Sequence, residues 1–307
     1  MTAALRPAAA FLRQLGTLVG LVLLALILAS ILAPVIAPDD PEALVATKLQ
    51  PPSGTHLMGT DQLGRDVLSR VVYGGRYTLL SAAVAVLIAA GAGIPLGLIA
   101  GYVRAWPSAL IMRVMDVLLA FPGLLLALVI VTIAGQGITS VTVAIGIAFT
   151  PIFVRLVYGA VLSARGADYV LAARLIGCSP GRIVVRHILP NISGQIIVVV
   201  SSAFGWAILT GTILNFLGFG VQPPTPEWGA DLAASKDWLA QGWWACTFPG
   251  VAIAIAILAA NYFGDAWAAG SGRRWSRRHG AASPALAAET PLVDPAAVAS
   301  SPEDATP

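Results

Sequence analysis

Two long stretches of this sequence, residues 117–154 and 187–226, contain no aspartate, glutamate, lysine or arginine. A helix crosses the hydrocarbon core of a bilayer with about 20 apolar residues, so both stretches are long enough to span a membrane. Hydrophobic residues make up 57% of the chain and charged residues 11%, whereas about a quarter of the residues are charged in soluble domains. One soluble core could not bury that much apolar surface. The sequence therefore predicts an all-α, polytopic membrane protein.

Apolar runs separated by polar or glycine-rich residues predict six transmembrane helices. The third and fourth share one apolar run, which Gly135-Gln136-Gly137 divides. The first is longer than the roughly 7–15 residues of a signal-peptide core, so we expect it to be retained. The predicted spans are residues 15–37, 77–103, 117–134, 138–158, 192–214 and 245–267.

These spans divide the chain into predicted regions. We expect a cytoplasmic N-terminus (1–14), the first span (15–37), an extracytoplasmic segment (38–76), a core of five spans (77–267) and a cytoplasmic tail (268–307). The end of the tail is rich in Ala, Ser, Pro and acidic residues without periodicity, which predicts disorder.

The distribution of lysine and arginine predicts the orientation of the spans. With the N-terminus inside, the inner segments hold 13 of the 18 basic residues. Both termini and the loop at 165–191 are therefore expected in the cytoplasm. The outer segments retain Lys48, Arg65, Arg70, Arg76 and Lys236. Tryptophans predicted near the outer interface are Trp228, Trp238, Trp243 and Trp244, and those predicted near the inner interface are Trp106 and Trp267.

Two outer segments are long. In residues 38–76, a Pro/Gly-rich entry precedes a predicted amphipathic helix, on which Asp61, Arg65 and Asp66 can pair at helical spacing, each pair contributing a few tenths of a kcal/mol. Residues 217–244 contain three prolines, which stiffen the chain and block regular structure. Either segment could be a solvated connection, but length and rigidity favour a docking or lid role.

Charged residues are absent from the centres of the predicted spans, which argues against a proton- or voltage-driven device. Asp116 and Asp265 fall at predicted cytoplasmic ends of spans, where water can reach them. The polar side chains inside spans are expected to form interhelical hydrogen bonds rather than to bind a substrate. They include Thr132, Thr150, Asn215 and Asn261.

The sequence lacks several familiar catalytic and binding motifs, so no catalytic residue is predicted. The phosphate-binding loop GxxxxGK[ST] needs Lys before Ser or Thr, but Lys48 and Lys236 precede Leu49 and Asp237. There is also no GxSxG elbow and no acid–base pair. If ATP drives this protein, another chain must bind it.

Metal and nucleic-acid sites are not expected either. His56, His187 and His279 lie far apart without Cys or a carboxylate at ligand spacing. The basic residues lie between apolar runs, with no basic patch interleaved with aromatic residues. Cys178 and Cys246 fall on opposite sides of the membrane in the predicted topology, which excludes a disulfide between them.

Small residues repeat every fourth position in the second predicted span. Ala89, Gly93, Gly97 and Gly101 form a stripe that lets another helix approach closely, and Pro95 should kink the helix. Close helix packing is the favoured interpretation, and the alternative is that the stripe faces a partner subunit.

Residues 168–191, DYVLAARLIGCSPGRIVVRHILPN, form a charged island between apolar runs. Residues 169–176 can form two helical turns, which Gly177 would end. Ser179 and Pro180 then resemble an N-cap followed by a first-turn proline, predicting a second helix to about Ile188 that stops at Pro190. A cytoplasmic loop that only obeys the positive-inside rule needs arginines but not this helix–glycine–helix pattern. We therefore expect a rigid cytoplasmic protrusion.

This island resembles the EAA loop of bacterial ABC-importer permeases, with the pattern EAA, three residues, Gly, nine residues, I-x-L-P. Matching positions are Ala172, Ala173, Gly177, Leu189 and Pro190, and the departures are Leu171 for the usual Glu and His187 for Ile. The resemblance implies a seat for a cytoplasmic ATPase. The residues implied in that coupling loop (165–191) are Ala172, Ala173, Arg174, Gly177, Ser179, Arg182, Arg186, Leu189 and Pro190.

Most of the chain is similar to the dipeptide/oligopeptide/nickel permease family. HLMGTDQLGRDVLSRVVYGGR (56–76), NFLGFGVQPPTPEWGADL (215–232) and FPGVAIAIAILAANYFGD (248–265) resemble its signatures, and the first span followed by GTDxLGRD resembles the C-type subunit. The resemblance implies a type I ABC-importer permease fold in a bacterial inner membrane. It also implies a B-type permease partner, two cytoplasmic ATPases, an extracytoplasmic binding protein and surrounding lipid, with ATP and Mg²⁺ bound by the ATPases and no cofactor on this chain.

The expected activity is import of di- or oligopeptides. Nickel chelates or glutathione are alternative cargoes on the same architecture. From another class, a membrane scaffold or sensor that transports nothing is the second hypothesis, and a membrane-embedded hydrolase is a distant third.

Overall fold

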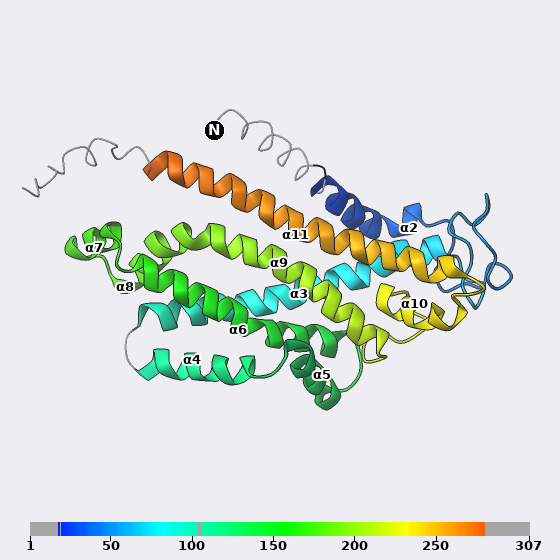
Figure 1. The fold of residues 1–307 in the computed structure, drawn as a ribbon, viewed down its shortest axis with the longest axis horizontal. Helices are drawn as coiled ribbons and strands as arrows, with labels where there is room; N and C mark the ends of the chain where they lie inside the picture. Colours follow the sequence, from blue (N-terminus) through cyan, green and yellow to red (C-terminus); the bar gives the residue numbers. More distant parts are fainter. Residues whose placement is uncertain (1–17, 19, 104–105, 280–307) are drawn as a thin grey trace, which may run out of the picture. The chain divides into compact units, whose positions relative to one another are not determined.

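The computed structural model describes residue 18 and residues 20–103 and 106–279, with side chains described to Gly264 (Figure 1). The chain divides into two compact units, residues 1–268 and 269–307. Within the described residues the secondary structure is helical, apart from one isolated bridge between Thr60 and Asp66. The predicted N-terminal region 1–14 and the tail beyond residue 279 lie outside the described residues.

An apolar helix, Gly20–Ile31, precedes the labelled elements. These are α2 (Ala33–Ile36), α3 (Val67–Tyr102), α4 (Trp106–Leu119), α5 (Gly123–Ala134), α6 (Ile138–Ala164), α7 (Asp168–Leu175), α8 (Pro180–Ile183), a π-helical segment (Val184–Ile188), α9 (Leu189–Phe216), α10 (Trp228–Ser235), a 3₁₀ turn (Lys236–Trp238) and α11 (Trp243–His279).

Within the described residues, four helices are long and apolar enough to cross a membrane: Val67–Tyr102, Ile138–Ala164, Pro180–Phe216 and Trp243–Gly264. A fifth crossing is reached if α4 and α5 are counted together. In the first predicted span, 15–37, the described helix Gly20–Ile31 is shorter than a full crossing. The expected helical membrane architecture is confirmed, whereas the count of six is not reached.

The third predicted span, residues 117–134, is not one helix. It is divided between α4 and α5, which bend by 90° at the break between them. Pro122 occupies the N-cap of α5 with an extended ψ of 128°. Because proline disfavours the helical conformation of the residue before it, Phe121, the Phe-Pro-Gly sequence interrupts the apolar run. Hydropathy alone does not reveal this break within residues 117–134.

The second predicted span begins earlier than expected, at Val67 rather than Tyr77. Asp66 caps α3, because its carboxylate accepts a hydrogen bond from the Ser69 amide at 2.7 Å. The amphipathic helix predicted to carry Asp61, Arg65 and Asp66 is absent, since residues before Val67 form turns. Gly59 and Gly64 adopt positive φ there, which favours turns over helix.

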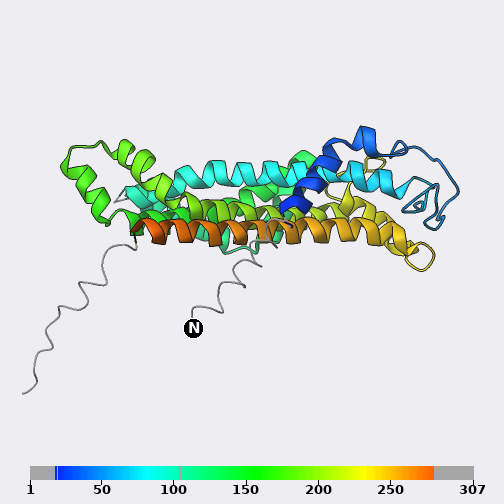
Figure 2. The same ribbon diagram turned by 90° about the horizontal axis from the view of Figure 1, so that it is seen from above.

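The helices of the first unit lie lengthwise beside one another, with α7 and α8 at one end and α10 with the segment 38–66 at the other (Figures 1 and 2). The closest pair is α3 and α6. A Cβ added to Gly93, Gly97 or Gly101 would lie 2.5–2.7 Å from side-chain carbons of Phe153, Val157 and Val161 on α6, respectively. The glycine stripe therefore packs within this chain, and these contacts exclude the alternative that it faces a partner subunit.

Thr132, Thr150 and Asn215 do not form the expected interhelical hydrogen bonds, and two of the tryptophans predicted near the outer interface are buried. Trp228 and Trp244 are buried inside the protein, where their indole N–H groups donate to the carbonyls of Val71 and Thr60. Thr132 and Thr150 bond carbonyls four residues earlier in their own helices, and Asn215 accepts from the Val221 amide in the next loop. Local backbone acceptors compete successfully for short polar side chains.

Candidate functional site

The loop between α6 and α9 contains two short helices joined at a glycine. Helix α7 ends in a Schellman motif, in which the Cys178 amide donates to the Ala173 carbonyl and the Gly177 amide donates to the Arg174 carbonyl, both at 3.0 Å. Gly177 has φ of +80°, the left-handed conformation that this motif requires. Ser179 then occupies the N-cap of α8 with Pro180 in the first turn, although the serine side chain makes no capping bond.

The second helix of the loop does not stop at Pro190 as expected. Helix α8, the π-helical segment and α9 follow one another without a break from Pro180 to Phe216. Proline lacks an amide hydrogen and crowds the carbonyl four residues earlier. The π-helical turn just before Pro190, where the Leu189 amide donates to the Val184 carbonyl, widens the helix and accommodates the proline ring.

A hydrophobic cluster holds the loop against the long helices. Val170 of α7, Ile183 of α8 and Ile188 of the π-helical segment are at most 1% exposed and pack with Val157 and Val161 of α6. Cys178 packs at the edge of the same cluster as a free thiol. The two helices are therefore fixed to the transmembrane helices by packing.

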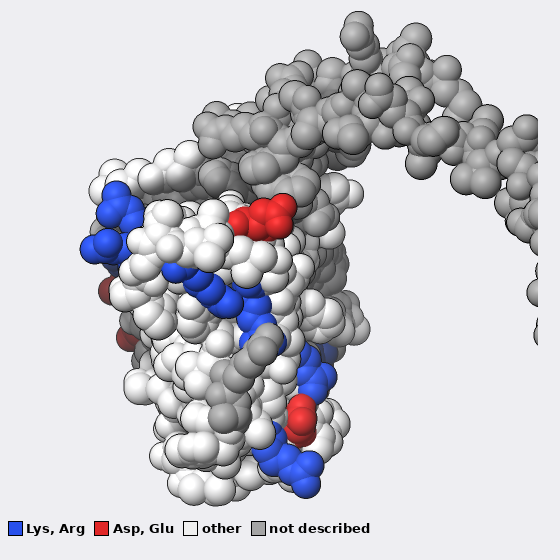
Figure 3. Space-filling view, turned by 90° about the vertical axis from the view of Figure 1, so that its left-hand side faces the viewer, with Lys and Arg blue, Asp and Glu red and all other residues white. Residues whose placement is uncertain are grey.

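The opposite surface of the loop combines arginines with exposed apolar side chains. Arg182 and Arg186 are exposed, and the Arg174 guanidinium lies 5.6 Å from the centroid of the Tyr102 ring. Figure 3 looks onto this end of the unit, where the charged side chains are predominantly basic. Leu175 and Ile176 are 88% and 79% exposed. An apolar surface of this kind is typical of a protein interface.

Some of the predicted loop residues face the hydrophobic cluster, and others lie on the exposed surface of the loop. Ala173 faces the hydrophobic cluster, while Ala172 and Pro190 are exposed and Leu189 is half-buried. The exposed Leu175 and Ile176 were not among the predicted site residues. Their signal was an apolar pair directly before the helix-ending Gly177, where the chain turns away from the core.

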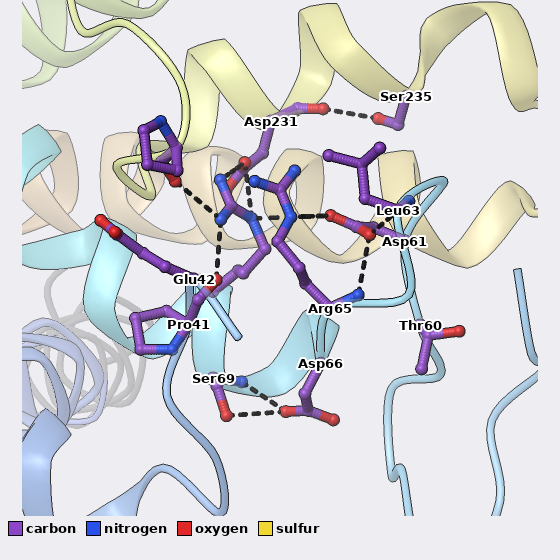
Figure 4. Close-up of polar contacts among 12 residues, drawn as sticks. Pro41, Glu42, Thr60, Asp61, Leu63, Arg65, Asp66, Ser69, Asp231 and Ser235 are labelled. Atoms are coloured by element: carbon purple, nitrogen blue, oxygen red, sulfur yellow. Dashed lines mark hydrogen bonds and ion pairs between the residues drawn. The ribbon is translucent and has the colours of Figure 1, made fainter. Parts of the chain in front are cut away.

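A network of buried charged side chains, among them Asp61, Arg65 and Asp231, lies at the opposite end of the unit (Figure 4). Arg70 also belongs to this network. Its guanidinium forms an ion pair with Asp231 of α10 and donates to the carbonyls of Pro41 and Pro224 at 2.9 and 3.1 Å. Asp61 pairs with Arg65 at 2.6 Å. All four charged side chains are nearly fully buried. The network joins the segment 38–66 to α10, so this segment is a folded part of the protein.

Glu227 is also buried at this end, at the N-cap of α10. Its carboxylate accepts from the Thr78 hydroxyl at 2.6 Å and from the Ala230 amide at 2.8 Å. Burial raises the pKa of Glu227 to about 7, although these hydrogen bonds oppose the rise. Burial likewise raises the pKa of Asp231 to about 6, with Arg70 opposing it.

The fold brings together one His and two carboxylates that are distant in sequence. The ligand atoms of Asp39, His56 and Asp66 lie within 4.8 Å of one another, and His56 Nδ1 is 3.2 Å from Asp66 Oδ1. Sequence spacing did not indicate this juxtaposition, because the three residues come together only through the fold. That the chain holds no metal stays a prediction. Asp66 is hydrogen-bonded to His56 and caps α3 by accepting from the Ser69 amide.

Comparison with known proteins gives consistent matches. The profile of the family described as "Binding-protein-dependent transport system inner membrane component" matches residues 93–277. The di/tripeptide transport system permease protein DppC of Pseudomonas aeruginosa is 43% identical over 263 residues, which cover 83% of this chain and 87% of that protein. The glutathione transport system permease protein GsiD of Pectobacterium atrosepticum is 40% identical, covering 83% and 86%.

The probable D,D-dipeptide transport system permease protein DdpC of Escherichia coli is 39% identical, with coverage of 74% and 76%. Among solved structures, the chain is similar to the MetNI methionine ABC transporter in an inward-facing conformation. The TM-score is 0.55 at 16% identity, covering 65% of this chain and 94% of the matched chain. At that identity the similarity shows a common fold.

Proposed function

Because this chain belongs to the family of binding-protein-dependent transport system inner membrane components, we propose that it is one membrane-spanning subunit of an ATP-driven peptide importer. The permease itself carries out no covalent chemistry, and ATP hydrolysis takes place on separate subunits. Relatives named as di/tripeptide and dipeptide permeases, 43% and 44% identical, support a short peptide as the cargo.

The coupling role is supported mainly by the packing that holds the coupling loop, residues 165–191, against the long helices. Val170, Ile183 and Ile188 attach it to the long helices, and Leu175 and Ile176 remain exposed. A cytoplasmic ATPase that binds this exposed surface would move α8 and α9 together, since no break separates them. ATP binding would then bias the permease between inward- and outward-open states.

The proposed assembly contains a B-type permease, two ATPases that bind ATP and Mg²⁺, and an extracytoplasmic binding protein. Both termini and the coupling loop face the cytoplasm, as the excess of basic residues favours. The folded outer end around Arg70 is the surface that the binding protein would meet.

The test is ATP-dependent uptake by proteoliposomes that contain all these subunits. We expect uptake of a labelled dipeptide that requires ATP, the binding protein and this chain. A tetrapeptide tested in parallel sets the upper size of the cargo. ATP hydrolysis stimulated by the loaded binding protein without uptake of either peptide would refute peptide import, and a complex without ATPase subunits would favour the scaffold or sensor hypothesis.

Glutathione is the second candidate cargo, since a glutathione permease is 40% identical over nearly the same length. It is itself a tripeptide with a free amine and free carboxylates. Competition between unlabelled glutathione and a labelled dipeptide in the same proteoliposomes distinguishes the two cargoes.

A further inference from the structure

Three side chains of the types that bind metal ions meet where the segment 38–66 adjoins the start of α3. Asp39 lies near the beginning of that segment, His56 lies within it, and Asp66 is the N-cap of α3. One ligand atom from each residue lies within 4.8 Å of those from the other two. The prediction that the chain holds no metal considered spacing in the sequence, which does not reveal residues that the fold brings together.

The distances within this cluster suit a small divalent ion. A tetrahedral zinc ion binds nitrogen and oxygen at about 2.0–2.1 Å, so neighbouring ligand atoms lie about 3.3 Å apart. His56 Nδ1 and Asp66 Oδ1 are already 3.2 Å apart. The Asp39 carboxylate lies no more than 4.8 Å from either atom. It would have to approach by at most about 1.5 Å, which a change of its side-chain torsion angles can supply.

The two carboxylates of the cluster lack a permanent positive partner. Asp66 is fully buried and Asp39 is half-buried. In the part of the chain that the structure describes, the hydrogen bond found for Asp39 is made by its backbone amide, and its carboxylate has none. Carboxylates this close repel each other, and a cation between them removes the repulsion. His56 supplies one positive charge only when it is protonated, whereas a divalent ion balances both carboxylates.

Ser69 orients two of the three ligands. Its amide and hydroxyl both donate to Asp66 Oδ2, at 2.7 and 2.8 Å, so Oδ1 remains available on the side of His56 (Figure 4). The Ser69 hydroxyl oxygen also accepts from the Asp39 amide at 3.2 Å. Carboxylates that bind metal ions are typically held by outer hydrogen bonds of this kind. The position of Asp66 is therefore fixed before any ion binds.

The composition of the cluster favours zinc over the hard alkaline-earth ions. Imidazole nitrogen is a good ligand for Zn²⁺, whereas Mg²⁺ and Ca²⁺ prefer sites made of oxygen alone. Three protein ligands leave one tetrahedral position for water. The His56 side chain is 13% exposed, so the cluster lies just below the surface, where an ion can enter from solvent.

We propose that Asp39, His56 and Asp66 bind one Zn²⁺ ion, which fastens the segment 38–66 to the start of α3. Water occupies the fourth position. The ion joins the beginning and the middle of the segment to the N-cap of the helix, at the end of the unit opposite the coupling loop. This assignment is independent of the cargo and of transport, and its tests use neither.

The first measurement is the affinity for Zn²⁺. The full-length chain, without a polyhistidine tag, is purified in detergent, freed of metal with EDTA and titrated with Zn²⁺ against a chromophoric chelator. Wild type should bind one ion. His56→Gln and Asp39→Asn should each weaken binding more than tenfold, and Ser69→Ala by about tenfold, since outer hydrogen bonds contribute about 10–100-fold to affinity. Equimolar Mg²⁺ should not compete with Zn²⁺.

Asp40→Asn is the matched control. Asp40 is the exposed neighbour of Asp39, and its carboxylate accepts from the Glu42 amide at 2.8 Å. This variant removes a carboxylate beside the site and should bind Zn²⁺ like wild type. The proposal would be overturned if wild type bound no Zn²⁺, or if His56→Gln and Asp39→Asn bound it as tightly as wild type.

The second measurement asks whether the ion fastens the segment. At a free Zn²⁺ concentration ten times the dissociation constant, openings that separate the ligands become about tenfold rarer. Backbone amides of residues 38–66 that exchange through such openings should therefore exchange about tenfold more slowly in wild type, and at an unchanged rate in His56→Gln. Zn²⁺ binding that leaves exchange in this segment unchanged would contradict the fastening role.

Two of the variants guard against a folding defect. Asp39→Asn keeps the imidazole and nearly the same side-chain shape, and Ser69→Ala keeps the amide that Asp66 caps at 2.7 Å. Circular dichroism should show wild-type helix content for both. If His56→Gln does not fold, the loss of Zn²⁺ affinity and of slowed exchange in these two variants decides the proposal, and wild-type values in both would refute it.

Discussion

Glu227 lies in the most unusual environment for a carboxylate in the described residues outside the membrane-spanning helices. It is fully buried beside Thr78 and Asp231, and its pKa is about 7 instead of the usual 4.5. Folding therefore favours the protonated form. The stabilisation contributed by protonated Glu227 is complete below about pH 4.5 and is lost as the pH rises through about 7.

Replacement of Glu227 by Gln should reduce the pH dependence of stability. The unfolding temperature of the purified protein in detergent should fall less between about pH 5 and pH 8 than that of wild type, because glutamine stays neutral in the buried site. Above pH 7 the variant should be more stable by an amount on the order of 1–3 kcal/mol. Asp231, with a raised pKa of about 6, leaves a residual dependence.

The matched control is Glu42→Gln, which neutralises an exposed glutamate at the same end of the unit. This variant should retain the pH dependence of wild type. Equal slopes of unfolding temperature against pH for wild type and Glu227→Gln would contradict the buried-glutamate explanation.

At the scale of elements, the coupling loop depends on the left-handed turn between α7 and α8. Gly177→Val places a β-branched residue at φ of +80°, which costs about 1–2 kcal/mol. The direction of α8 relative to α7 should change, while membrane insertion is retained. We expect peptide uptake and binding-protein-stimulated ATP hydrolysis by the assembled complex to fall about tenfold.

Gly181→Val is the matched control for this prediction. Gly181 lies four residues away in α8, is also exposed, and has no neighbouring atom within 4 Å of an added Cβ, but its φ is not positive. Coupled transport at the wild-type rate in Gly177→Val, or equal losses in both variants, would contradict the role of the turn.

The elements differ in how much of them the sequence predicts. Gly177, Ser179 and Pro180 are local signals, and the structure has the helix end and the N-cap where they predict them. The bend at Pro122 also had a local signal, which the long apolar run obscured. The continuation of α8 into α9 through Pro190 had no local sequence signal, because a π-helical turn depends on the whole helix and its packing.

At the scale of the whole molecule, the predicted topology places the coupling loop and the outer network on opposite faces of the membrane. A single cysteine at Gln241, in the exposed turn before α11, should react with an impermeant maleimide added to intact cells. A single cysteine at the exposed Ser179 should react after permeabilisation. The reverse pattern would show that the chain is inserted in the opposite orientation.

The outer network could not be predicted from the sequence. Arg70 and Asp231 are 161 positions apart, and their pairing depends on the arrangement of α3 and α10. The ion pair between Asp116 and Arg155 also escaped prediction, because the two residues are 39 positions apart and lie on different helices.

The π-helical segment at Val184–Ile188 has a geometric consequence for the reach of α9. The 28 residues of α9 form a rod of about 42 Å. Because the π-helical segment carries the helix past Pro190 without a break, a tilt of about 5° at the coupling-loop end displaces the far end of α9, near α10, by about 4 Å. A small change of angle at the cytoplasmic end therefore shifts the outer end of α9 by about the length of a side chain.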